Sequence, residues 1–255
     1  MTKEKLFLLD VLKSFIHEEK LNFDTGVDWG EGQRLAQIHS VTGILGYMVT
    51  QNPCECTAQP ADMLKNQCFA NVAVFAHRTK KADELIAKLN DAGIDHMLFK
   101  GYVVRNYYPM PELRSYGDID ILIKPEDRKR SHELMLAQGF EVKDDWEPVY
   151  SYHNNFELYE IHTEVMEVDV SDKADYRGYF NTAWEHVKNV GGHTFEPTPE
   201  FHFLYLLTHI AKHIRGSGAG IRMYLDLAVF VKHFGDSVDW RYIESKLEEL
   251  KLKEF

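Results

Sequence analysis

The stretch FKGYVVRNYYPMPELRSYGDIDILI, residues 99–123, carries the pattern that decides the fold. Lys100-Gly101 follows a short apolar segment, and Asp118 and Asp120 lie in a second, otherwise apolar segment that predicts a strand. Residues two apart on a strand project from the same face, so we expect the two carboxylates to point together, roughly 7 Å apart. Carboxylates in an apolar strand are costly unless another charge compensates them.

A divalent cation would remove this cost. Two parallel carboxylates repel each other, and burial raises the pKa of one or both. Mg²⁺ prefers a few carboxylates together with water and phosphate oxygens. In the alternative interpretation, the aspartates cap turns or pair with Arg105 and Arg114. We favour the metal interpretation, because the strand is otherwise apolar and a phosphate-type element precedes it.

That preceding element is Lys100-Gly101, at an expected junction between a strand and a short helix. Glycine lets the backbone approach a ligand, the N-terminal amides of a helix face anions, and lysine adds a point charge. A Lys-Gly dipeptide is commonly only a turn. Its place directly before the aspartate strand indicates a phosphate-binding element.

A third acid is expected on a neighbouring strand. In LYEIHTEVMEVDV, residues 158–170, strand alternation places Glu160 and His162 on one face. Glu160 is therefore the predicted third carboxylate, and Asp169 is the second choice. In the alternative interpretation, Glu160 lies on a solvent-facing strand edge.

The sequence divides into three expected regions. Residues 1–93 predict an N-terminal helical region, in which apolar residues from Leu64 to Leu89 form the stripe of one long helix that Gly93 ends. Residues 94–196 predict a mixed α/β core, and residues 197–255 predict a C-terminal helical region. The chain end at LEELKLKEF is either a natural end or a truncation.

The core and the C-terminal region contain the following expected elements. Strands are expected at HMLF, DIDILI, FEVK and in the antiparallel pair YSYHNNFEL and YEIHTEVMEVDV, with a hairpin turn at Gly191-Gly192. Helices are expected from Pro125 to Gly139, near Tyr176 to Val187, and at about 199–215, 221–234 and 238–250, where Thr198-Pro199 begins the first of these three.

Composition indicates a soluble globular protein, with 44% hydrophobic and 27% charged residues. The sequence contains no apolar run of about 18 residues, the length of a membrane helix. The N-terminus lacks the apolar core and cleavage site of a signal peptide, so we expect a cytoplasmic protein. Cys54, Cys56 and Cys68 are expected to be free thiols, because no second cysteine pair completes a metal site.

The formal net charge of −11 argues against a protein that coats nucleic acid, since phosphate contacts require a basic surface. A locally basic active site remains compatible with this charge. For any acceptor, a small molecule or a protein is therefore favoured over long nucleic acid.

The ordered motifs resemble the polymerase-β-type nucleotidyltransferase superfamily, and more narrowly its bacterial branch labelled "uncharacterised nucleotidyltransferase". The motifs that carry the resemblance are Lys100-Gly101, Arg114, Gly117-Asp118-Ile119-Asp120, Glu160-Ile161-His162, His209 with His213, and Arg222 with Asp226. The resemblance covers roughly residues 30–250. It implies an α+β fold, with a mixed-sheet nucleotidyltransferase core between helical regions. Members of the branch often continue past the end of this chain, which favours truncation.

This sequence departs from the wider superfamily at two places. The superfamily has Gly-Ser where this chain has Lys100-Gly101, so the usual serine contact to phosphate is missing. The third acid, commonly aspartate, is Glu160 here.

The resemblance implies transfer of a nucleoside monophosphate from an NTP to a hydroxyl of an acceptor that the sequence does not name. Asp118 and Asp120 would hold Mg²⁺ or Mn²⁺, and Glu160 would help to hold a second ion or accept the proton of the acceptor. The residues expected at the nucleotide are Lys100, Gly101, Arg114, His162, Lys212 and His213.

Two alternatives to this function are open. The first is a catalytically inactive nucleotide-binding or antitoxin-like interaction protein on the same fold, against which the retained acids argue. The second is a different metal-dependent phosphotransferase or hydrolase that uses His209 and His213. Arg222 and Asp226, one helical turn apart, are expected to pair with each other. The tyrosines Tyr102, Tyr107, Tyr108 and Tyr116 are expected mainly to pack the core.

Overall fold

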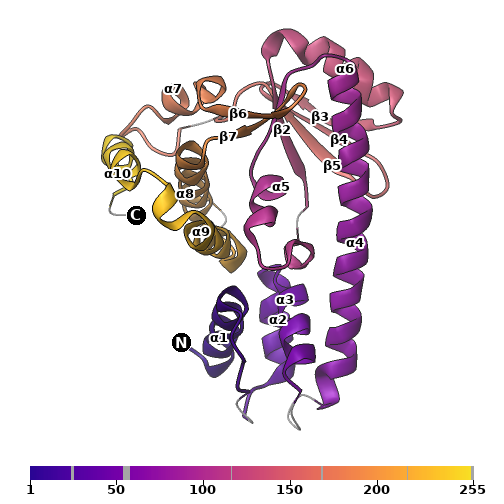
Figure 1. The fold of residues 1–255 in the computed structure, drawn as a ribbon, viewed down its shortest axis with the longest axis vertical. Coiled ribbons are helices and arrows are strands. Elements are labelled where there is room, and N and C mark those ends of the chain that lie inside the picture. Colours follow the sequence, from indigo (N-terminus) through magenta and orange to yellow (C-terminus); the bar gives the residue numbers. More distant parts are fainter. Residues whose placement is uncertain (24–25, 54–57, 116, 168, 217, 254–255) are drawn as a thin grey trace. The chain divides into compact units, whose positions relative to one another are not determined.

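The computed structural model describes residues 1–23, 26–53, 58–115, 117–167, 169–216 and 218–253. The chain forms two compact units (Figure 1). The first unit comprises Met1–His77, Arg105–Ser115 and Ala219–Val229, and the second comprises Arg78–Val104, Tyr116–Gly218 and Phe230–Phe255. Cys54, Cys56 and Tyr116 lie outside the described residues. No helix within the described ranges is long and apolar enough to cross a membrane.

The first unit is built from helices. It contains α1 (Lys3–His17), α2 (Trp29–Ile38), α3 (Thr42–Gln51), the beginning of α4 (Ala58–Asp91), the 3₁₀ turns η2 (Arg105–Tyr107) and η3 (Pro111–Leu113), and most of α9 (Ile221–Phe234). Its core forms because α1 buries one apolar face, from Phe7 to Ile16. Asp28 fixes the start of α2 by accepting from the amides of Gly30 and Glu31.

A glycine allows α3 to approach α4 closely. A Cβ atom added at Gly46 would lie 2.3 Å from the backbone oxygen of Leu64, a distance at which the atoms overlap. A Cβ atom at Gly32 of α2, by contrast, would find its nearest neighbours at 4.0 Å, which is ordinary contact. The packing of α3 on α4 therefore depends on the missing side chain at Gly46.

The second unit is organised around a seven-stranded mixed sheet of order β3-β4-β5-β2-β1-β7-β6. The strands are β1 (His96–Leu98), β2 (Ile119–Ile123), β3 (Glu141–Trp146), β4 (Val149–His153), β5 (Leu158–His162), β6 (Val187–Gly191) and β7 (Thr194–Pro197). Strand β2 pairs antiparallel with β1 and parallel with β5. The register places Asp120 opposite Glu160, so the two acidic motifs are neighbours on adjacent strands.

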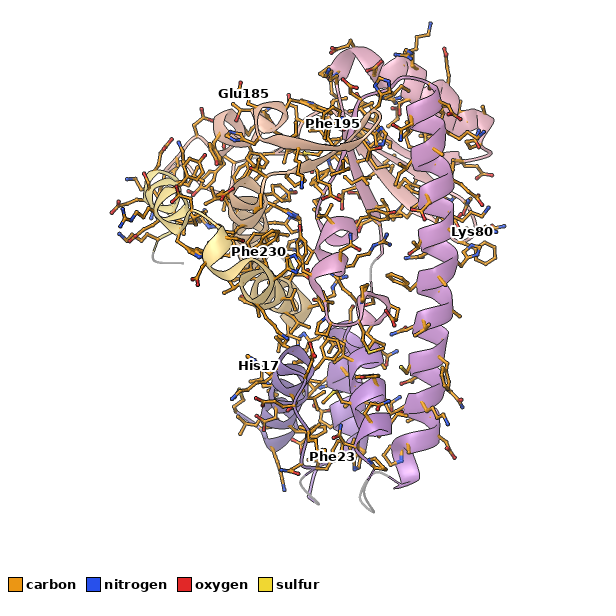
Figure 2. The ribbon with its side chains drawn as sticks, in the orientation of Figure 1. His17, Phe23, Lys80, Glu185, Phe195 and Phe230 are labelled. Atoms are coloured by element: carbon orange, nitrogen blue, oxygen red, sulfur yellow. The ribbon has the colours of Figure 1, made fainter. Side chains whose placement is uncertain are left out.

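Helices cover both faces of this sheet. The helices of the unit are α5 (Gly101–Val104), α6 (Arg128–Ala137), α7 (Tyr176–Phe180), α8 (Pro199–Arg215) and α10 (Trp240–Glu249), with the ends of α4 and α9. On one face, His132 of α6 contacts the buried Tyr152 of β4. On the other face, Tyr205 of α8 packs edge-on against Phe99, which follows β1. Figure 2 shows Phe230 among the side chains of the second unit, where it packs on Phe203 of α8.

The observed elements confirm most of the expected ones. Helices α8 and α9 have the expected bounds, β6 and β7 form the expected hairpin, and the mixed α/β core confirms the fold class. Gly93, which follows α4, has a φ of 65°, a conformation that suits glycine. Three expected elements are shorter. Strand β4 ends at His153 and not near Leu158, and strand β5 ends at His162 and not near Val170. The expected helix at 176–187 divides into α7 and the turn η5 (Ala183–Glu185) before β6 begins.

We expect Gly46→Ala to destabilise the protein by about 1–3 kcal/mol, because the added methyl group must displace the backbone of α4. Gly32→Ala is the matched control, since the same change in α2 meets only ordinary contacts. Urea unfolding of both variants measures the difference. Equal stability of the two variants would contradict the close approach of α3 and α4.

Candidate active site

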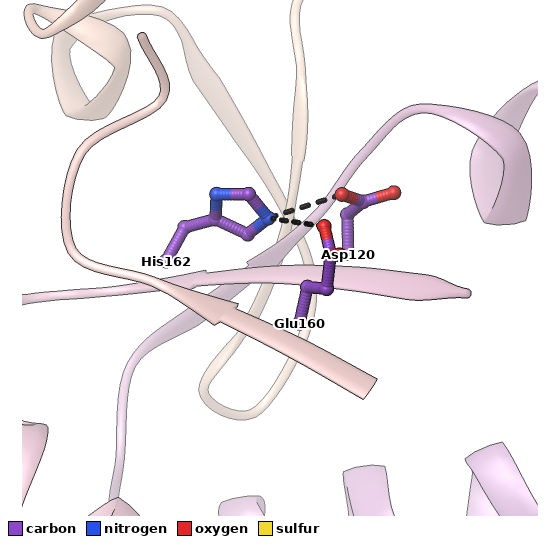
Figure 3. Close-up of side chains that lie close together, drawn as sticks. All are labelled: Asp120, Glu160 and His162. Atoms are coloured by element: carbon purple, nitrogen blue, oxygen red, sulfur yellow. Dashed lines mark hydrogen bonds and ion pairs between the residues drawn. The ribbon is translucent and has the colours of Figure 1, made fainter. Parts of the chain in front are cut away.

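The candidate site lies where β2 and β5 run side by side in the second unit. Asp120, only 3% exposed, accepts at Oδ1 from Lys100 Nζ at 2.5 Å and from His162 Nε2 at 3.0 Å. The same His162 nitrogen lies 3.6 Å from Glu160 Oε2. Figure 3 shows His162 reaching both acids from β5. The expectation that Glu160 and His162 share one face of their strand is therefore confirmed.

Asp120, Glu160 and His162 form a possible metal site. One potential ligand atom from each lies within 4.8 Å of the others, and no further group of this kind occurs among the described residues. The acids fit a hard cation that prefers oxygen. His162 fits less well, because its Nε2 already donates to Asp120 and its buried Nδ1 has no hydrogen-bond partner among the described residues. The second nitrogen of a metal-bound imidazole usually makes a hydrogen bond. The site therefore offers carboxylates as metal ligands, and His162 holds them in place as a hydrogen-bond donor.

Asp118, directly before β2, belongs to the same electrostatic group. Burial, followed by the charges of Asp120 and Glu160, raises its pKa, and the opposing charge of Lys100 does not cancel this effect. Asp118 is partly exposed, so its carboxylate is accessible to a ligand. The charge of Asp120 is among the causes that raise the pKa of Asp118, as expected for two neighbouring carboxylates, and their projection from one face of the strand stays a prediction.

Lys100 supplies the compensating charge at Asp120. Burial alone would lower the pKa of Lys100, but Asp120, together with Tyr205 and Glu160, raises it, so the ammonium stays charged. Conversely, burial would raise the pKa of Asp120, but Lys100 and His162 together lower it. The alternative that the aspartates pair with arginines is therefore wrong for Asp120, whose partners are a lysine and a histidine.

The expected junction of strand and helix at Lys100-Gly101 is confirmed. Strand β1 ends at Leu98, and α5 begins at Gly101. Lys100 itself has a φ of 51°, which lies in the left-handed region that side chains with a Cβ rarely adopt. Such backbone conformations persist where the surroundings fix them, commonly at functional sites.

Helix α8 lines the site, as the spaced histidines led us to expect. Tyr205 stacks on His209 with ring centroids 5.8 Å apart, and His209 Nε2 lies 3.1 Å from His213 Nε2. Burial, then the nearby Lys100, lowers the pKa of His209. Burial, then Lys212, lowers the pKa of His213. Both imidazoles are therefore neutral at neutral pH, and one nitrogen donates to the other.

Sequence reasoning missed Tyr205 and Arg78. Tyr205 lies at the i, i+4, i+8 spacing with the two histidines, and this spacing could have placed it on the same face of α8. Arg78 of α4 donates to the backbone oxygen of Gly117 at 3.1 Å and to that of Phe156 at 3.2 Å. It thereby ties the loop that carries Asp118 to the turn between β4 and β5. No local pattern in the sequence indicates this contact.

Other predicted site residues lie apart from the acids. Lys212 pairs with Glu167 at 3.6 Å, on an exposed part of α8. Asp169 lies beyond the end of β5 and accepts from the backbone amide of Arg177 at 3.0 Å, so it helps to hold the start of α7. Glu160, and not Asp169, is the acid in register with Asp120.

Arg114 and Asp226 form a buried ion pair within the first unit. Both Nε and Nη2 of Arg114 donate to Asp226 at 2.8 Å, and Tyr108 donates to the same carboxylate at 2.7 Å. Arg222 donates to the backbone oxygen of Ser115. The expectation that Asp226 pairs with Arg222 is therefore wrong, because the buried guanidinium of Arg114 binds the Asp226 carboxylate through two nitrogens. A nucleotide contact of Arg114 stays a prediction.

The chain has an α+β fold that is similar to the folds of the following solved structures. ANT(2'')-Ia in complex with adenylyl-2''-tobramycin aligns with a TM-score of 0.50 and 10% identity over 70% of this chain and 99% of that chain. The antibiotic-resistance factor ANT(2'')-Ia in solution aligns with a TM-score of 0.49 and 10% identity over 68% of this chain and 92% of that chain. The Megavirus polyadenylate synthase aligns with a TM-score of 0.39 and 15% identity over 85% of this chain and 40% of that chain.

The family described as "Uncharacterised nucleotidyltransferase" matches residues 25–255, so this chain belongs to that family. A search of curated proteins found no match. Family membership confirms the resemblance inferred from the motifs and the assignment to a class of transferase enzymes.

We expect Asp118→Asn to stabilise the metal-free protein at neutral pH, because it removes one of the mutually repelling charges. The folded pKa of Asp118 exceeds its unfolded value, so the folded state binds more protons and loses stability as the pH rises through that folded pKa. Thermal unfolding with EDTA should therefore show a higher Tm for the variant at pH 7, and a smaller difference near pH 4.

Asp144→Asn, an equal change of charge on the exposed strand β3, is the control and should leave the Tm nearly unchanged. A Tm of Asp118→Asn at or below that of the unchanged protein would contradict the repulsion among the acids.

Proposed function

We propose that the protein is a divalent-metal-dependent nucleotidyltransferase that moves a nucleoside monophosphate from an NTP to a hydroxyl group of an acceptor. The observation that carries this proposal is the pairing of β2 with β5, which brings Asp120 beside Glu160, with Asp118 directly before β2 and affected by both charges. Nucleotidyl transfer depends mostly on positioning the reactants and neutralising charge, which such a group serves.

Asp118, Asp120 and Glu160 are the residues that would hold the ion. Mg²⁺ or Mn²⁺ suits them, because both cations prefer carboxylate oxygen and retain positions for water and phosphate. When bound, the ion would neutralise the charge of the triphosphate and act as a Lewis acid on it.

The protein side chains divide the remaining work. The side chain of Glu160 is 26% exposed, more than that of Asp120, so Glu160 is the acid best able to reach an acceptor hydroxyl and take its proton. His162 holds Asp120 and Glu160 at a fixed separation through one nitrogen. His162 thus acts here as a positioning residue, in place of the predicted nucleotide contact.

The triphosphate is proposed to lie between the acids and α8. Lys100 carries a permanent positive charge, and Gly101 begins a short helix beside it. The Lys212 ammonium and its partner Glu167 are both partly exposed, so this weak ion pair can exchange for a phosphate contact. His213 lies on the same turn of the helix as Lys212. Arg114, which belongs to the first unit, stays a prediction as a nucleotide contact.

The acceptor is proposed to be a small molecule or a protein side chain in the cytoplasm. The net charge of −11 disfavours extended contact with nucleic acid. ANT(2'')-Ia, which has a similar fold, was crystallised with an adenylylated small molecule. That complex supports the choice of a small hydroxyl compound as the first class of acceptor to test.

A specific observation favours a second candidate, an inactive nucleotide-binding or interaction protein on the same fold. Lys100 already neutralises Asp120, and Arg114 is engaged by Asp226, so two predicted nucleotide contacts have protein partners. In this candidate function, the ion pairs are permanent and the site binds no metal.

Turnover of NTPs distinguishes the two functions. The protein is incubated with each NTP and Mg²⁺ in the presence of a panel of hydroxyl compounds, and release of pyrophosphate is measured. We expect Mg²⁺-dependent release that Asp120→Asn lowers roughly a hundredfold or more, because a principal charge of the site is lost. Asp144→Asn is the control and should retain the activity.

Unchanged turnover in Asp120→Asn would contradict the proposed site. Calorimetry with Mg²⁺ and each NTP measures nucleotide binding and also separates the two functions. Failure of the unchanged protein to bind any NTP would favour the inactive interaction protein.

A further inference from the structure

Lys100 and His162 share one oxygen of a buried carboxylate that belongs to the proposed metal site. Lys100 Nζ and His162 Nε2 both bond Asp120 Oδ1, and the structure records no partner for Asp120 Oδ2 among the residues it describes. The cation nearest to the acids is thus supplied by the chain itself. The backbone of Lys100 is unusual, because it adopts a left-handed conformation that a glycine would adopt more readily.

We propose that Lys100 is a resident counter-ion that competes with the divalent metal for Asp120 and moves to the triphosphate when the metal and the nucleotide bind together. This inference rests on the proposed function, since it takes Asp118, Asp120 and Glu160 as the metal site. Lys100 then has two partners in succession, and its release couples metal binding to nucleotide binding.

The distribution of charge supports the competition. Asp120 and Glu160 are paired across β2 and β5, and Asp118 directly precedes β2, so three carboxylates accompany one lysine ammonium, which bonds Asp120. A divalent ion at these acids would satisfy them without the lysine. It would also repel the ammonium, because two cations bound to one carboxylate lie only a few ångströms apart in a site of low dielectric constant.

Of the two groups on Asp120, Lys100 is the one able to leave. His162 is fixed by its place on β5 and by Phe99, whose ring packs edge-on against it with centroids 5.2 Å apart. The lysine has a flexible four-carbon side chain that is 17% exposed. The released ammonium needs another anion, and the triphosphate of a bound nucleotide would provide one.

This exchange has a thermodynamic consequence. In the absence of nucleotide, the metal must displace the ammonium without supplying a new anion for it, so the affinity for the metal is low. With nucleotide present, the ammonium gains phosphate oxygens, and the same metal binds more tightly. Linkage requires that the metal raise the affinity for nucleotide by the same factor.

Mn²⁺ binding to the full chain at pH 7.5, measured by calorimetry and electron paramagnetic resonance, tests the inference. The measurement is made with Mn²⁺ alone and again with a saturating non-hydrolysable NTP analogue. We expect the unchanged protein to bind Mn²⁺ at least tenfold more tightly with the analogue. We expect Lys100→Met to bind Mn²⁺ alone at least tenfold more tightly than the unchanged protein, and to lose most of the effect of the analogue.

Lys124→Met is the matched control. Lys124 pairs with Asp95 at 2.7 Å just beyond the far end of β2, so this variant loses a lysine–aspartate pair of the same kind outside the site. It should bind Mn²⁺ and the analogue as the unchanged protein does. If Lys100→Met fails to fold, Lys100→Gly, which suits the left-handed backbone, provides the same comparison.

The outcomes separate the inference from the proposed function. If Mn²⁺ binds the unchanged protein but Lys100→Met or Lys100→Gly binds Mn²⁺ alone no more tightly, the exchange is overturned and the metal-dependent function stands. If Mn²⁺ binds none of the proteins, even with the analogue, the metal-dependent function is overturned, and the exchange with it.

Discussion

The buried carboxylate of Asp120 is the constraint on which the second unit depends. A charge in the middle of a sheet is tolerated only if it is paired, and here one oxygen receives both an ammonium and an imidazole. Each partner requires part of the topology. Lys100 follows the antiparallel neighbour β1, and His162 and Glu160 lie on the parallel neighbour β5. Helix α8 packs on the same side of the sheet, where Tyr205 contacts Phe99. The sheet order thus explains why residues distant in sequence share one site.

The same arrangement explains why the site suits nucleotidyl transfer. The acids are held by protein cations too few to neutralise them, so the metal-free site retains repulsion at Asp118. Stored repulsion of this kind costs stability in the free protein and is released when a cation binds. The buried carboxylate of the first unit differs from these acids. Asp226 accepts two hydrogen bonds from the guanidinium of Arg114 and one from Tyr108, and such complete pairing suits a structural role. A buried charge can therefore mark either function or architecture, and the completeness of its pairing distinguishes them.

Local patterns predicted the parts of the fold that depend on short-range physics. Alternation with a period of two placed Glu160 and His162 on one face of β5, and helix signals gave the bounds of α8 and α9. The sequence predictions were wrong or incomplete where contacts between residues distant in the chain determine the structure. The bond from Lys100 to Asp120 depends on strand register, the early end of β5 depends on the elements that follow it, and the partner of Asp226 lies more than a hundred residues away in the chain. Such pairings follow from the assembled structure and from no local pattern in the sequence.

Anomalous diffraction from crystals of the chain grown with Mn²⁺ and a non-hydrolysable NTP analogue tests the central claim most directly. The claim is that the acids brought together by β2 and β5 form a metal-dependent nucleotidyl-transfer site. We expect a manganese peak bound by Asp118, Asp120 and a phosphate oxygen, with Glu160 beside it and Lys100 on the triphosphate. A nucleotide bound away from these acids, or a site without manganese in which Lys100 still holds Asp120, would contradict the claim.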